Sequence, residues 1–428
     1  MIKSIKNILI ILVVFFLLTG CNLLKKEEVV KHQYEDLLKE ITIGNTTGIT
    51  EYTIYGKHFN LKGDLNNISN SNLQLVLKSE EQELVYDLFI ENDTFKTNQY
   101  INRGILLENI PIGNYLVLLK QVLDEEVTYY NLINQTTYSD LEYYTMTRNN
   151  KNNKITIKYD TFNDYNYLCL EVKEQSLPNN IYDIVIDPGH GGTDSGAING
   201  KYQEGDINLE YALMLKEALE DVGLKVKLTR ESDETLKHYG IGSRTGIPYE
   251  TKAKLMLSLH LNSGKKNANG VEVYIASGDD VYLASSIANN IVNIANTKYS
   301  NNGSSRITKG VYSRVYEDSD IESAYESALE DGYIPYEIQS DTTYYYFIRE
   351  TGGIITKAFS DGRNPNFDAN IYYNSNHGTE AYLIELGYIS NNDNLLNLLN
   401  KKEEYVKAIK ESVVFYLNDG IEIEDNKE

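Results

Sequence analysis

Four side chains that can bind a metal or move a proton lie beside apolar, strand-like segments of this sequence. His190 stands in a glycine-rich turn directly after the apolar run 184–186, and His260 comes at the end of a second apolar run. Glu385 lies within a third run, where a charged carboxylate is costly to bury without a partner. Glu204 comes just before an amphipathic segment. Two histidines and one glutamate form a known catalytic zinc set, and a second carboxylate could then serve as general base.

Each of these residues, taken singly, also has an ordinary structural interpretation. A histidine at a strand end is more often a loop or core residue, and a glutamate in a strand often pairs with Arg or Lys. The prediction of a metal site therefore depends on the four patterns occurring together. Since the chain has only two cysteines, a cysteine-based zinc site is excluded.

The elements that would position these side chains follow from the spacing of the apolar residues. Residues 52–172 contain short strand-like runs separated by Asn, Gly and Asp, which indicates a β-sandwich-like region. From residue 184 onward, strand-like runs alternate with helical patterns, which indicates an α/β domain with a largely parallel sheet, whose sites form at the carboxyl ends of strands. The expected strands are 73–77, 115–119, 155–159, 168–172, 184–186, 226–228, 255–259, 271–275 and 382–386, and the expected helices are 34–41, 209–222, 282–295 and 403–417.

The first 21 residues have the features of an exported bacterial protein. A basic start precedes the apolar run 8–18, whose 11 residues are too few to span a bilayer, which takes about 20. The run leads into Leu18-Thr19-Gly20-Cys21, which resembles a bacterial lipobox. We therefore expect a lipoprotein signal peptide at 1–20 and a lipid anchor on Cys21 at the outer face of a bacterial cell membrane. An ordinary signal peptide or anchor helix with a chance cysteine is the alternative.

The remaining chain is expected to contain a tether and two domains. The tether spans 21–45, a β-rich domain of unknown role spans 46–175, and an α/β domain spans 181–420 with an expanded segment at about 300–376. The composition of the 428 residues, with 41% hydrophobic and 24% charged residues, is that of a globular protein. The net charge of −22 argues against a nucleic-acid partner, because a surface that follows phosphates needs a basic patch.

Six separated patterns occur in order between residues 181 and 418: IDPGHGG at 186–192, Glu204 with Asn208-Leu209, Thr229-Arg230, SLHLN at 258–262, Glu385-Leu386-Gly387, and Ser390-Asn391. Together they resemble the zinc-dependent N-acetylmuramoyl-L-alanine amidases, often called the amidase 3 family. The resemblance implies a twisted sheet flanked by helices, and zinc bound by His190, Glu204 and His260. It implies that Glu385 is the catalytic carboxylate. The implied substrate is peptidoglycan, cleaved at the amide that joins N-acetylmuramic acid to the L-alanine of the stem peptide.

The chain also departs from the family pattern. Pro248-Tyr249 stands where the family often has Ala-Asn, and the gap between His260 and Glu385 is long. Within that gap, the aromatic segment Tyr344–Arg349 is expected to be a core strand, although its tyrosines could instead line a sugar or peptide groove. Asn262 and Arg349 are the expected substrate contacts. For Arg230 and Arg244, a structural role in ion pairs is the favoured interpretation.

Residues 317–331 predict an amphipathic helix in the expanded segment. Ser319 and Glu322 suggest a capping box, and the apolar stripe consists of Ile321, Ala324, Tyr325, Ala328 and Leu329. The opposite face is acidic, so a solvated helix beside the site is the favoured interpretation. The alternative is a plug whose carboxylate blocks the zinc until a regulatory protein removes it.

Two further functions remain as alternatives to a lipid-anchored amidase. The chain could be a catalytically silent wall-binding lipoprotein on the same fold. It could also be a zinc peptidase that acts on another bond of the cell wall. The presence of all four chemical positions argues against the first, and the pattern set argues against the second.

Overall fold

The computed structural model describes residues 33–44, 46–66, 68–146, 152–330, 332, 338–359 and 370–418. Its described part divides into two compact units, with the boundary between residues 42 and 43. The first unit contains helix α2 (Glu35–Glu40), which confirms the helix expected at 34–41. Cys21 and the expected signal peptide lie outside the described residues. Among the helices described, none is both long enough and apolar enough to cross a membrane.

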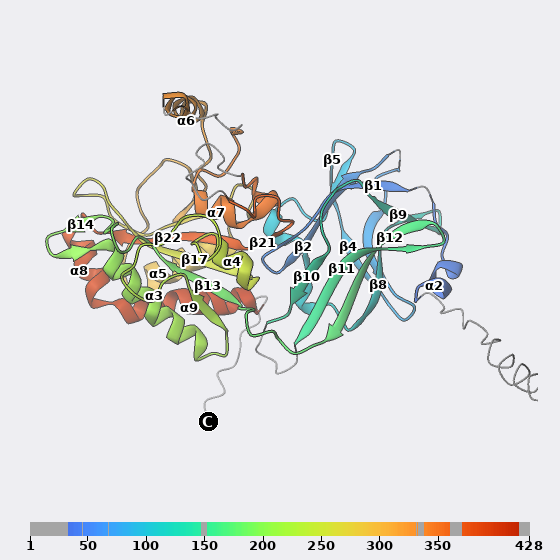
Figure 1. Cartoon of the computed structure of the whole chain (residues 1–428), viewed down its shortest axis with the longest axis horizontal. Coiled ribbons are helices and arrows are strands. Elements are labelled where there is room, and N and C mark those ends of the chain that lie inside the picture. Colours follow the sequence, from blue (N-terminus) through green and yellow to red (C-terminus); the bar gives the residue numbers. More distant parts are fainter. Residues whose placement is uncertain are drawn as a thin grey trace, which may run out of the picture. The chain divides into compact units, whose positions relative to one another are not determined.

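The segment from residue 47 to residue 174 is rich in strands, as the sequence predicted (Figure 1). Within the described residues, hydrogen bonds join these strands and one later strand into a 13-stranded sheet. Its buried residues, contributed by strands such as β1, β3 and β12, form a single apolar core, so the sheet folds over this core as the layers of a sandwich do. The strands are β1 (Thr47–Tyr55), β2 (His58–Asp64), β3 (Leu73–Lys78), β4 (Glu83–Asp87), β5 (Phe89–Glu91), β6 (Thr94–Lys96), β7 (Ile105–Leu106), β8 (Gly113–Leu123), β9 (Glu126–Asn134), β10 (Leu141–Tyr144), β11 (Asn153–Phe162), β12 (Tyr165–Glu174) and the later β21 (His377–Gly378).

Two-residue turns explain three hairpins of this sheet. The pairs Asn92-Asp93, Asp124-Glu125 and Asn163-Asp164 connect β5 to β6, β8 to β9 and β11 to β12. All six residues have positive φ values between 47° and 71°. Two successive left-handed residues form the type I′ turn, whose twist matches that of paired strands, and Asn and Asp tolerate this conformation.

The segment from residue 184 to residue 417 forms a second sheet with helices on both faces, as predicted (Figure 1). The strand order is β16-β13-β17-β22-β18-β20-β19. The pairs β16/β13, β13/β17, β17/β22 and β18/β20 are parallel. The pairs β18/β22 and β19/β20 are antiparallel. The strands are β13 (Ile184–Pro188), β16 (Val226–Leu228), β17 (Leu255–Asn262), β18 (Glu272–Tyr274), β19 (Arg306–Thr308), β20 (Val311–Tyr312) and β22 (Glu380–Tyr388), and β14 (Ile198–Asn199) and β15 (Tyr202–Gln203) form a separate hairpin. The helices are α3 (Glu204–Glu220), α4 (Gly246–Thr251), α5 (Tyr282–Ile294), α6 (Asp318–Glu330), α7 (Tyr346–Thr351), α8 (Asn392–Asn400) and α9 (Lys402–Leu417).

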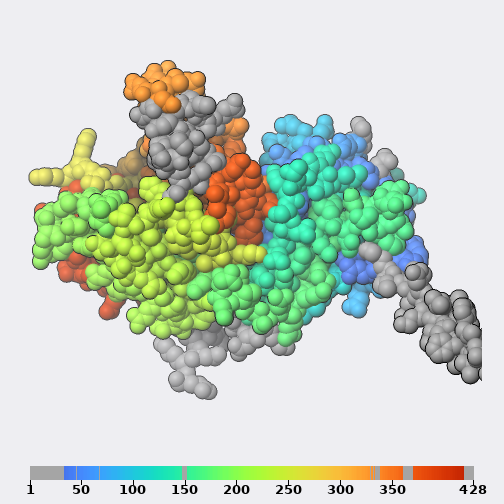
Figure 2. All heavy atoms as spheres, viewed as in Figure 1, coloured from blue at the N-terminus to red at the C-terminus, as the bar shows by residue number. Residues whose placement is uncertain are grey.

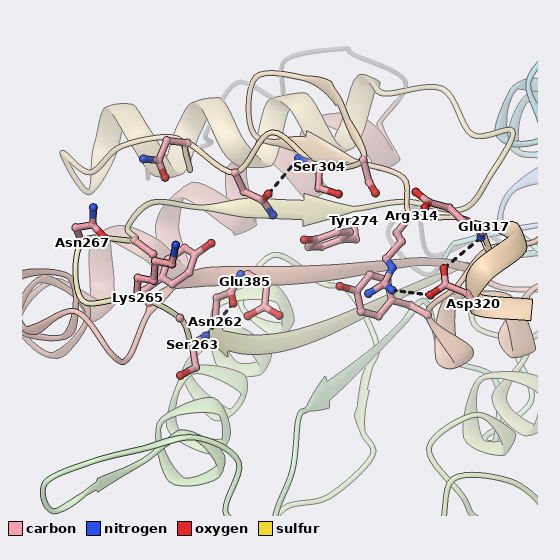
Figure 3. A pocket seen from close by; sticks show the side chains of 17 residues that line it. Asn262, Ser263, Lys265, Asn267, Tyr274, Ser304, Arg314, Glu317, Asp320 and Glu385 are labelled. Atoms are coloured by element: carbon pink, nitrogen blue, oxygen red, sulfur yellow. Dashed lines mark hydrogen bonds and ion pairs between the residues drawn. The ribbon is translucent and has the colours of Figure 1, made fainter. Parts of the chain in front are cut away.

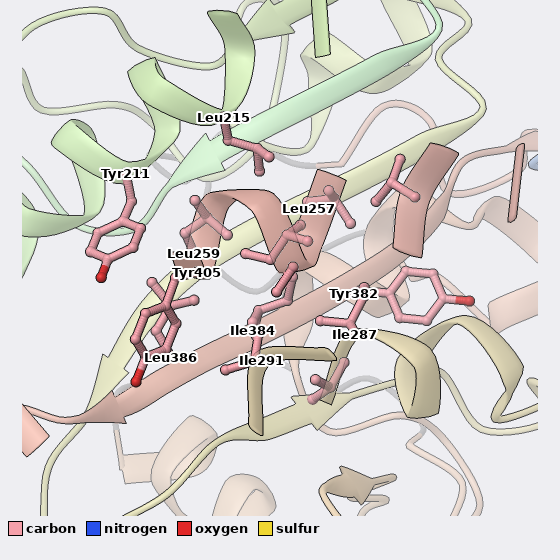
Figure 4. Packing of buried hydrophobic residues seen from close by; sticks show 14 of the residues in the cluster. Tyr211, Leu215, Leu257, Leu259, Ile287, Ile291, Tyr382, Ile384, Leu386 and Tyr405 are labelled. Carbon is pink, nitrogen blue, oxygen red and sulfur yellow. The ribbon is translucent and has the colours of Figure 1, made fainter. Parts of the chain in front are cut away.

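Alternate residues of the central strands enter two different apolar cores. Ile184 and Ile186 pack in the larger core, which is built with α3, α5, α8 and α9 (Figure 4). Val185, between them, packs in a smaller core with residues of α4 and α7. Because both faces are covered, the strands read as continuous apolar runs rather than as alternating ones.

The structure corrects the interpretation of Tyr344–Arg349 as a core strand. Residues from Tyr346 onward form the short helix α7, and Phe347 and Ile348 are buried in the smaller core beside Met256 and Leu383. Tyr and Phe have high strand propensity, but packing against neighbours overrides such local preferences. The helix expected at 209–222 is present but begins at Glu204, one and a half turns earlier.

Hydrogen bonds connect the first sheet to the second. β21 pairs with β1 in parallel, and it directly precedes the central strand β22. The Asn102 side-chain amide donates to Glu380 Oε1 over 2.9 Å, and Lys57 Nζ donates to the carbonyl oxygen of Tyr416 over 2.6 Å. Glu380 is only 1% exposed, so its carboxylate depends on such donors.

We expect that removal of residues 1–175 lowers the melting temperature of the remaining chain by several degrees relative to the full chain. The deletion removes a strand partner and one donor to buried Glu380, and an unsatisfied buried group costs about 1–3 kcal/mol. In a protein of this size each kcal/mol shifts the melting temperature by about 2–4 °C. Calorimetry of both chains measures the difference, and equal melting temperatures would contradict the expectation.

Candidate active site

The turn that carries His190 has an unusual backbone conformation. His190, Gly191 and Gly192 have φ values of 61°, 119° and 62°, so three successive residues lie in the region that favours glycine. A side chain at Gly189 would also lie 2.3 Å from the imidazole ring of His260. The glycines of the predicted motif therefore allow a strained turn and the close approach of the second histidine.

Two buried arginines hold this turn through its carbonyl oxygens. Arg230 donates to the carbonyl oxygens of Pro188 (3.1 Å) and Gly189 (3.0 Å). Arg244 donates to those of Pro188 (2.9 Å) and His190. Both side chains are therefore engaged in the structure of the turn, in line with the structural role favoured from the sequence.

Arg244 also forms a buried ion pair with Asp187, the residue at the end of β13. The two side chains are 2.6 Å apart, and the hydroxyls of Thr229 and Ser258 donate to the same carboxylate over 2.6 and 2.7 Å. Burial alone would raise the pKa of Asp187, but the charge of Arg244 and the two hydroxyl donors lower it overall. This carboxylate thus connects three neighbouring strands directly beneath the turn of His190.

His190, Glu204 and His260 converge as predicted, although they come from a turn, a helix start and a strand. Glu204 Oε1 lies 3.1 Å from His190 Nε2 and 3.1 Å from His260 Nδ1. One ligand atom from each residue lies within 4.8 Å of the other two. Two imidazole nitrogens and one carboxylate oxygen at this spacing fit a zinc ion with one position left open.

Hydrogen bonds and charges orient these three side chains. Asp194 Oδ2 lies 2.8 Å from His190 Nδ1, a carboxylate–histidine contact typical of the surroundings of bound metals. Glu204 Oε2 accepts the backbone N–H of Ala197 over 2.9 Å. Burial alone would raise the pKa of Glu204, but hydrogen bonds and charge from both histidines place it far below its ordinary value. Glu204 is therefore held as an anion, the form that binds a cation.

Glu385 differs from Glu204 in its surroundings. It pairs in register with His260, so the two side chains leave neighbouring strands on the same face of the sheet. Its buried Oε2 has no hydrogen-bond partner among the described residues. Burial, followed by the charges of Glu204 and Glu272, raises the pKa of Glu385 well above its ordinary value. A carboxyl group with these properties is suited to accept and release a proton.

Two pockets meet at Glu385 and Tyr345, which line both of them. The smaller pocket, of about 430 Å³, is also lined by His190 and His260. The larger pocket, of about 810 Å³, is lined by Asn262 and other polar side chains (Figure 3). Tyr345 was not singled out from the sequence, where it was one tyrosine of an aromatic run.

The two expected substrate contacts have different locations. Asn262 lines the larger pocket beside Glu385. Arg349 lines neither pocket: it is 2% exposed, forms an ion pair with Glu350, and donates to the carbonyl oxygens of Thr343 and Tyr344. The contacts of Arg349 are therefore structural, and its side chain does not reach a substrate in either pocket.

Helix α6 confirms the helix expected at 317–331, apart from Asp331, which lies outside the described residues. It lies at the surface of the molecule, apart from the other helices (Figures 1 and 2). The expected capping box at Ser319 is wrong, because the helix begins at Asp318 and Asp320 accepts the backbone N–H of Glu317. Two members of the expected apolar stripe are exposed: Tyr325 by 53% and Leu329 by 55%.

The carboxylates of α6 are not part of the candidate metal site formed by His190, Glu204 and His260. The only cluster found among the described residues contains His190, Glu204 and His260. Asp320 instead pairs with Arg314 over 3.4 Å, and both line the larger pocket (Figure 3). The structure thus offers no support for a carboxylate plug on the metal and makes the first turn of α6 part of the pocket wall.

We expect Arg244→Met to lower the free energy of unfolding by about 3–5 kcal/mol, because it leaves the buried carboxylate of Asp187 without its cation. The ion pair contributes fully to the free energy of unfolding above about pH 4, the ordinary carboxyl range. This contribution is lost as the pH falls through the lowered pKa of folded Asp187. Urea unfolding measures the difference. Arg306→Met, at an exposed position of β19, is the control and should change stability by less than about 0.5 kcal/mol. Equal effects of the two substitutions would contradict the role of the ion pair.

Comparison with known proteins finds similarity over the segment that contains His190, Glu204 and His260. Residues 184–328 match the family model described as N-acetylmuramoyl-L-alanine amidase (Amidase_3). The germination-specific N-acetylmuramoyl-L-alanine amidase of Bacillus subtilis (strain 168) is 37% identical over 102 residues, which are 21% of this chain and 43% of that protein. The sporulation-specific N-acetylmuramoyl-L-alanine amidase of the same organism is 39% identical over 94 residues, which are 22% of this chain and 35% of that protein. The chain thus spans less than half the length of these two curated relatives.

A solved structure is also similar to this chain. The catalytic domain of CwlV, an N-acetylmuramoyl-L-alanine amidase from Bacillus (Paenibacillus) polymyxa var. colistinus, is 22% identical, with a TM-score of 0.35. The match covers 56% of this chain and 99% of that chain. The family match itself contains His190, Glu204 and His260 and ends before Glu385. Residues 184–328 of this chain therefore resemble the N-acetylmuramoyl-L-alanine amidases of the Amidase_3 family, as the separated sequence patterns predicted.

Proposed function

We propose that this chain is a peptidoglycan hydrolase that cleaves the amide between N-acetylmuramic acid and the L-alanine of the stem peptide. The observation that carries the proposal is the buried, unpartnered Oε2 of Glu385 beside the His190, Glu204 and His260 cluster. The family match of residues 184–328 supports the substrate class. The names of the two Bacillus relatives, both N-acetylmuramoyl-L-alanine amidases, support the same scissile bond.

In this proposal the three clustered side chains hold zinc and Glu385 moves the proton. A zinc ion in this donor set would polarise the scissile carbonyl and lower the pKa of a water molecule. Glu385 accepts a proton from the attacking water, whose oxygen forms a bond to the carbonyl carbon. As the carbon–nitrogen bond breaks, Glu385 gives the proton to the amine of L-alanine. Its raised pKa suits it to both steps.

The arrangement also bears on the two alternative functions. A silent binding protein has no need of an unpartnered carboxyl next to a three-residue metal cluster, and both are present. A zinc peptidase for another wall bond would use similar chemistry at the metal, so the products distinguish it from an amidase. Free L-alanine amino termini identify the amidase, and other new termini identify the peptidase.

We expect the full chain to bind one zinc ion and to release L-alanine amino termini from purified muropeptides, and a chelator should abolish this activity. Glu385→Gln should keep the metal but lose activity by about two to four orders of magnitude, the usual contribution of a general base. Mass spectrometry of the products and metal analysis of the protein measure both effects. Normal turnover by Glu385→Gln would show that a group other than Glu385 transfers the proton.

The metal ligands are tested by histidines in different surroundings. His190→Ala should lose zinc, because it removes one of three protein ligands. His377→Ala is the control: this half-buried histidine has a pKa lowered to about 3, chiefly by desolvation, and lies outside the cluster. Folded His377→Ala should bind as much zinc per chain as the wild type. Full zinc occupancy in folded His190→Ala would contradict the proposed ligand set.

We also propose that the mature protein is anchored to the membrane by a lipid on Cys21. The lipobox-like segment that ends at Cys21 supports this proposal. Cys21→Ala should move the protein from the detergent phase to the aqueous phase in a partitioning assay. Cys169→Ala, which changes a buried cysteine of β12, should not. Unchanged partitioning of Cys21→Ala would contradict lipidation at this residue.

A further inference from the structure

Glu272 is a fully buried carboxylate next to the candidate site, and the mechanism proposed above makes no use of the hydrogen bonds that it accepts. It is 0% exposed and begins strand β18. Glu272 pairs with Glu385 in antiparallel register, so both side chains lie on the same face of the sheet. A carboxylate costs several kcal/mol to bury in such a place unless donors surround it.

Three side chains supply those donors. The hydroxyl of Tyr388 donates to Glu272 Oε1 over 2.5 Å. The hydroxyl of Tyr274 and the side-chain amide of Asn262 donate to Oε2 over 2.6 and 3.2 Å. In all three contacts the Glu272 carboxyl group is the acceptor, so together they fix the direction in which the three donors point.

All three donors line the larger pocket, which also includes Glu385. Figure 3 shows Asn262, Tyr274 and Glu385 near one another among the side chains that line this pocket. Glu272 is itself not part of the lining, so it lies beneath the pocket floor. Its contact with a bound molecule is therefore indirect, through the side chains that it holds.

We propose that Glu272 is a positioning residue, which fixes Asn262, Tyr274 and Tyr388 as a rigid floor for the part of the substrate that extends from the scissile amide into the larger pocket. This inference rests on the proposed function, since it assigns the pocket to the same substrate. A floor of fixed orientation spares the substrate the entropic cost of ordering those side chains when it binds. It also holds the scissile bond in line with Glu385.

The chain contains a second carboxylate of the same kind that serves as a matched control. Glu380 is 1% exposed, and its carboxylate accepts from Asn102, Tyr382 and Tyr416, again one amide and two tyrosine hydroxyls. It lies at the start of β22, and none of its three donors lines either pocket of the candidate site. Glu272 and Glu380 therefore share burial and bonding, and they differ in what their donors face.

The experiment compares Glu272→Gln with Glu380→Gln in the full chain, with kcat and KM on purified muropeptides, zinc content and melting temperature as readouts. Glutamine keeps the volume but loses an acceptor, so both variants should melt at a lower temperature. Glu272→Gln should raise KM on the order of tenfold, with zinc content unchanged and with a smaller effect on kcat. Glu380→Gln should leave KM within about twofold of the wild type.

A second variant removes a single contact and keeps the ring. Tyr388→Phe should raise KM by less than Glu272→Gln, and the effects of the two substitutions should not add in the double variant, because they act on one contact. Additive effects, an unchanged KM in Glu272→Gln, or equal changes of KM in Glu272→Gln and Glu380→Gln would each overturn the positioning role.

The same variants separate a failure of this inference from a failure of the proposed function. If the wild-type chain releases no L-alanine amino termini, the proposed function is wrong. Co-sedimentation with purified peptidoglycan then measures binding without turnover. Less sedimentation of Glu272→Gln than of Glu380→Gln would still support the positioning role, and equal sedimentation would overturn it.

Discussion

The register between β17 and β22 is the constraint on which the candidate site depends. In this register His260 and Glu385 are direct neighbours on one face of the sheet, while Leu259 and Ile384 enter the apolar core on the other face. A shift of one residue would turn Glu385 into that core and an isoleucine or leucine toward the metal cluster. The large core thus does more than stabilise the fold, because its apolar side chains select the only register in which the chemistry can assemble.

Buried carboxylates dominate the space around this register, and their surroundings give them different properties. Two histidines and a backbone N–H hold Glu204 as an anion, whereas Glu385 has a raised pKa and a free oxygen. Asp187 is neutralised by Arg244, and Glu272 is surrounded by hydroxyl and amide donors. Carboxyl groups whose pKa values are driven apart by their environments can take separate roles at one pH. Of Glu204, Asp187 and Glu385, Glu385 is the one that combines a raised pKa with an oxygen lacking a hydrogen-bond partner among the described residues.

The sequence predicted the parts of this molecule that have a local signal. Periodic apolar residues located the main strands and helices, and the glycines around His190 predicted a tight turn at the carboxyl end of a strand. It failed for α7, where aromatic residues of high strand propensity form a helix because Phe347 and Ile348 pack on the sheet. The roles of Tyr345 and Glu272 had no local signal, since each is defined by partners that are distant in the sequence.

The residues that have a local sequence signal form the candidate metal site, whereas Tyr345, which has none, lines both pockets. His190, Glu204 and His260 lie within the segment that matches the family, in a glycine turn, at the start of α3 and on β17 of the second sheet. Tyr345, which lines both pockets, lies outside the matched segment, in the expanded stretch before α7. Segments of this kind can vary in sequence and length while the scaffold keeps the reacting groups in place. A protein built in this way can keep its reacting groups in place while the walls of its pockets change to accept different ligands.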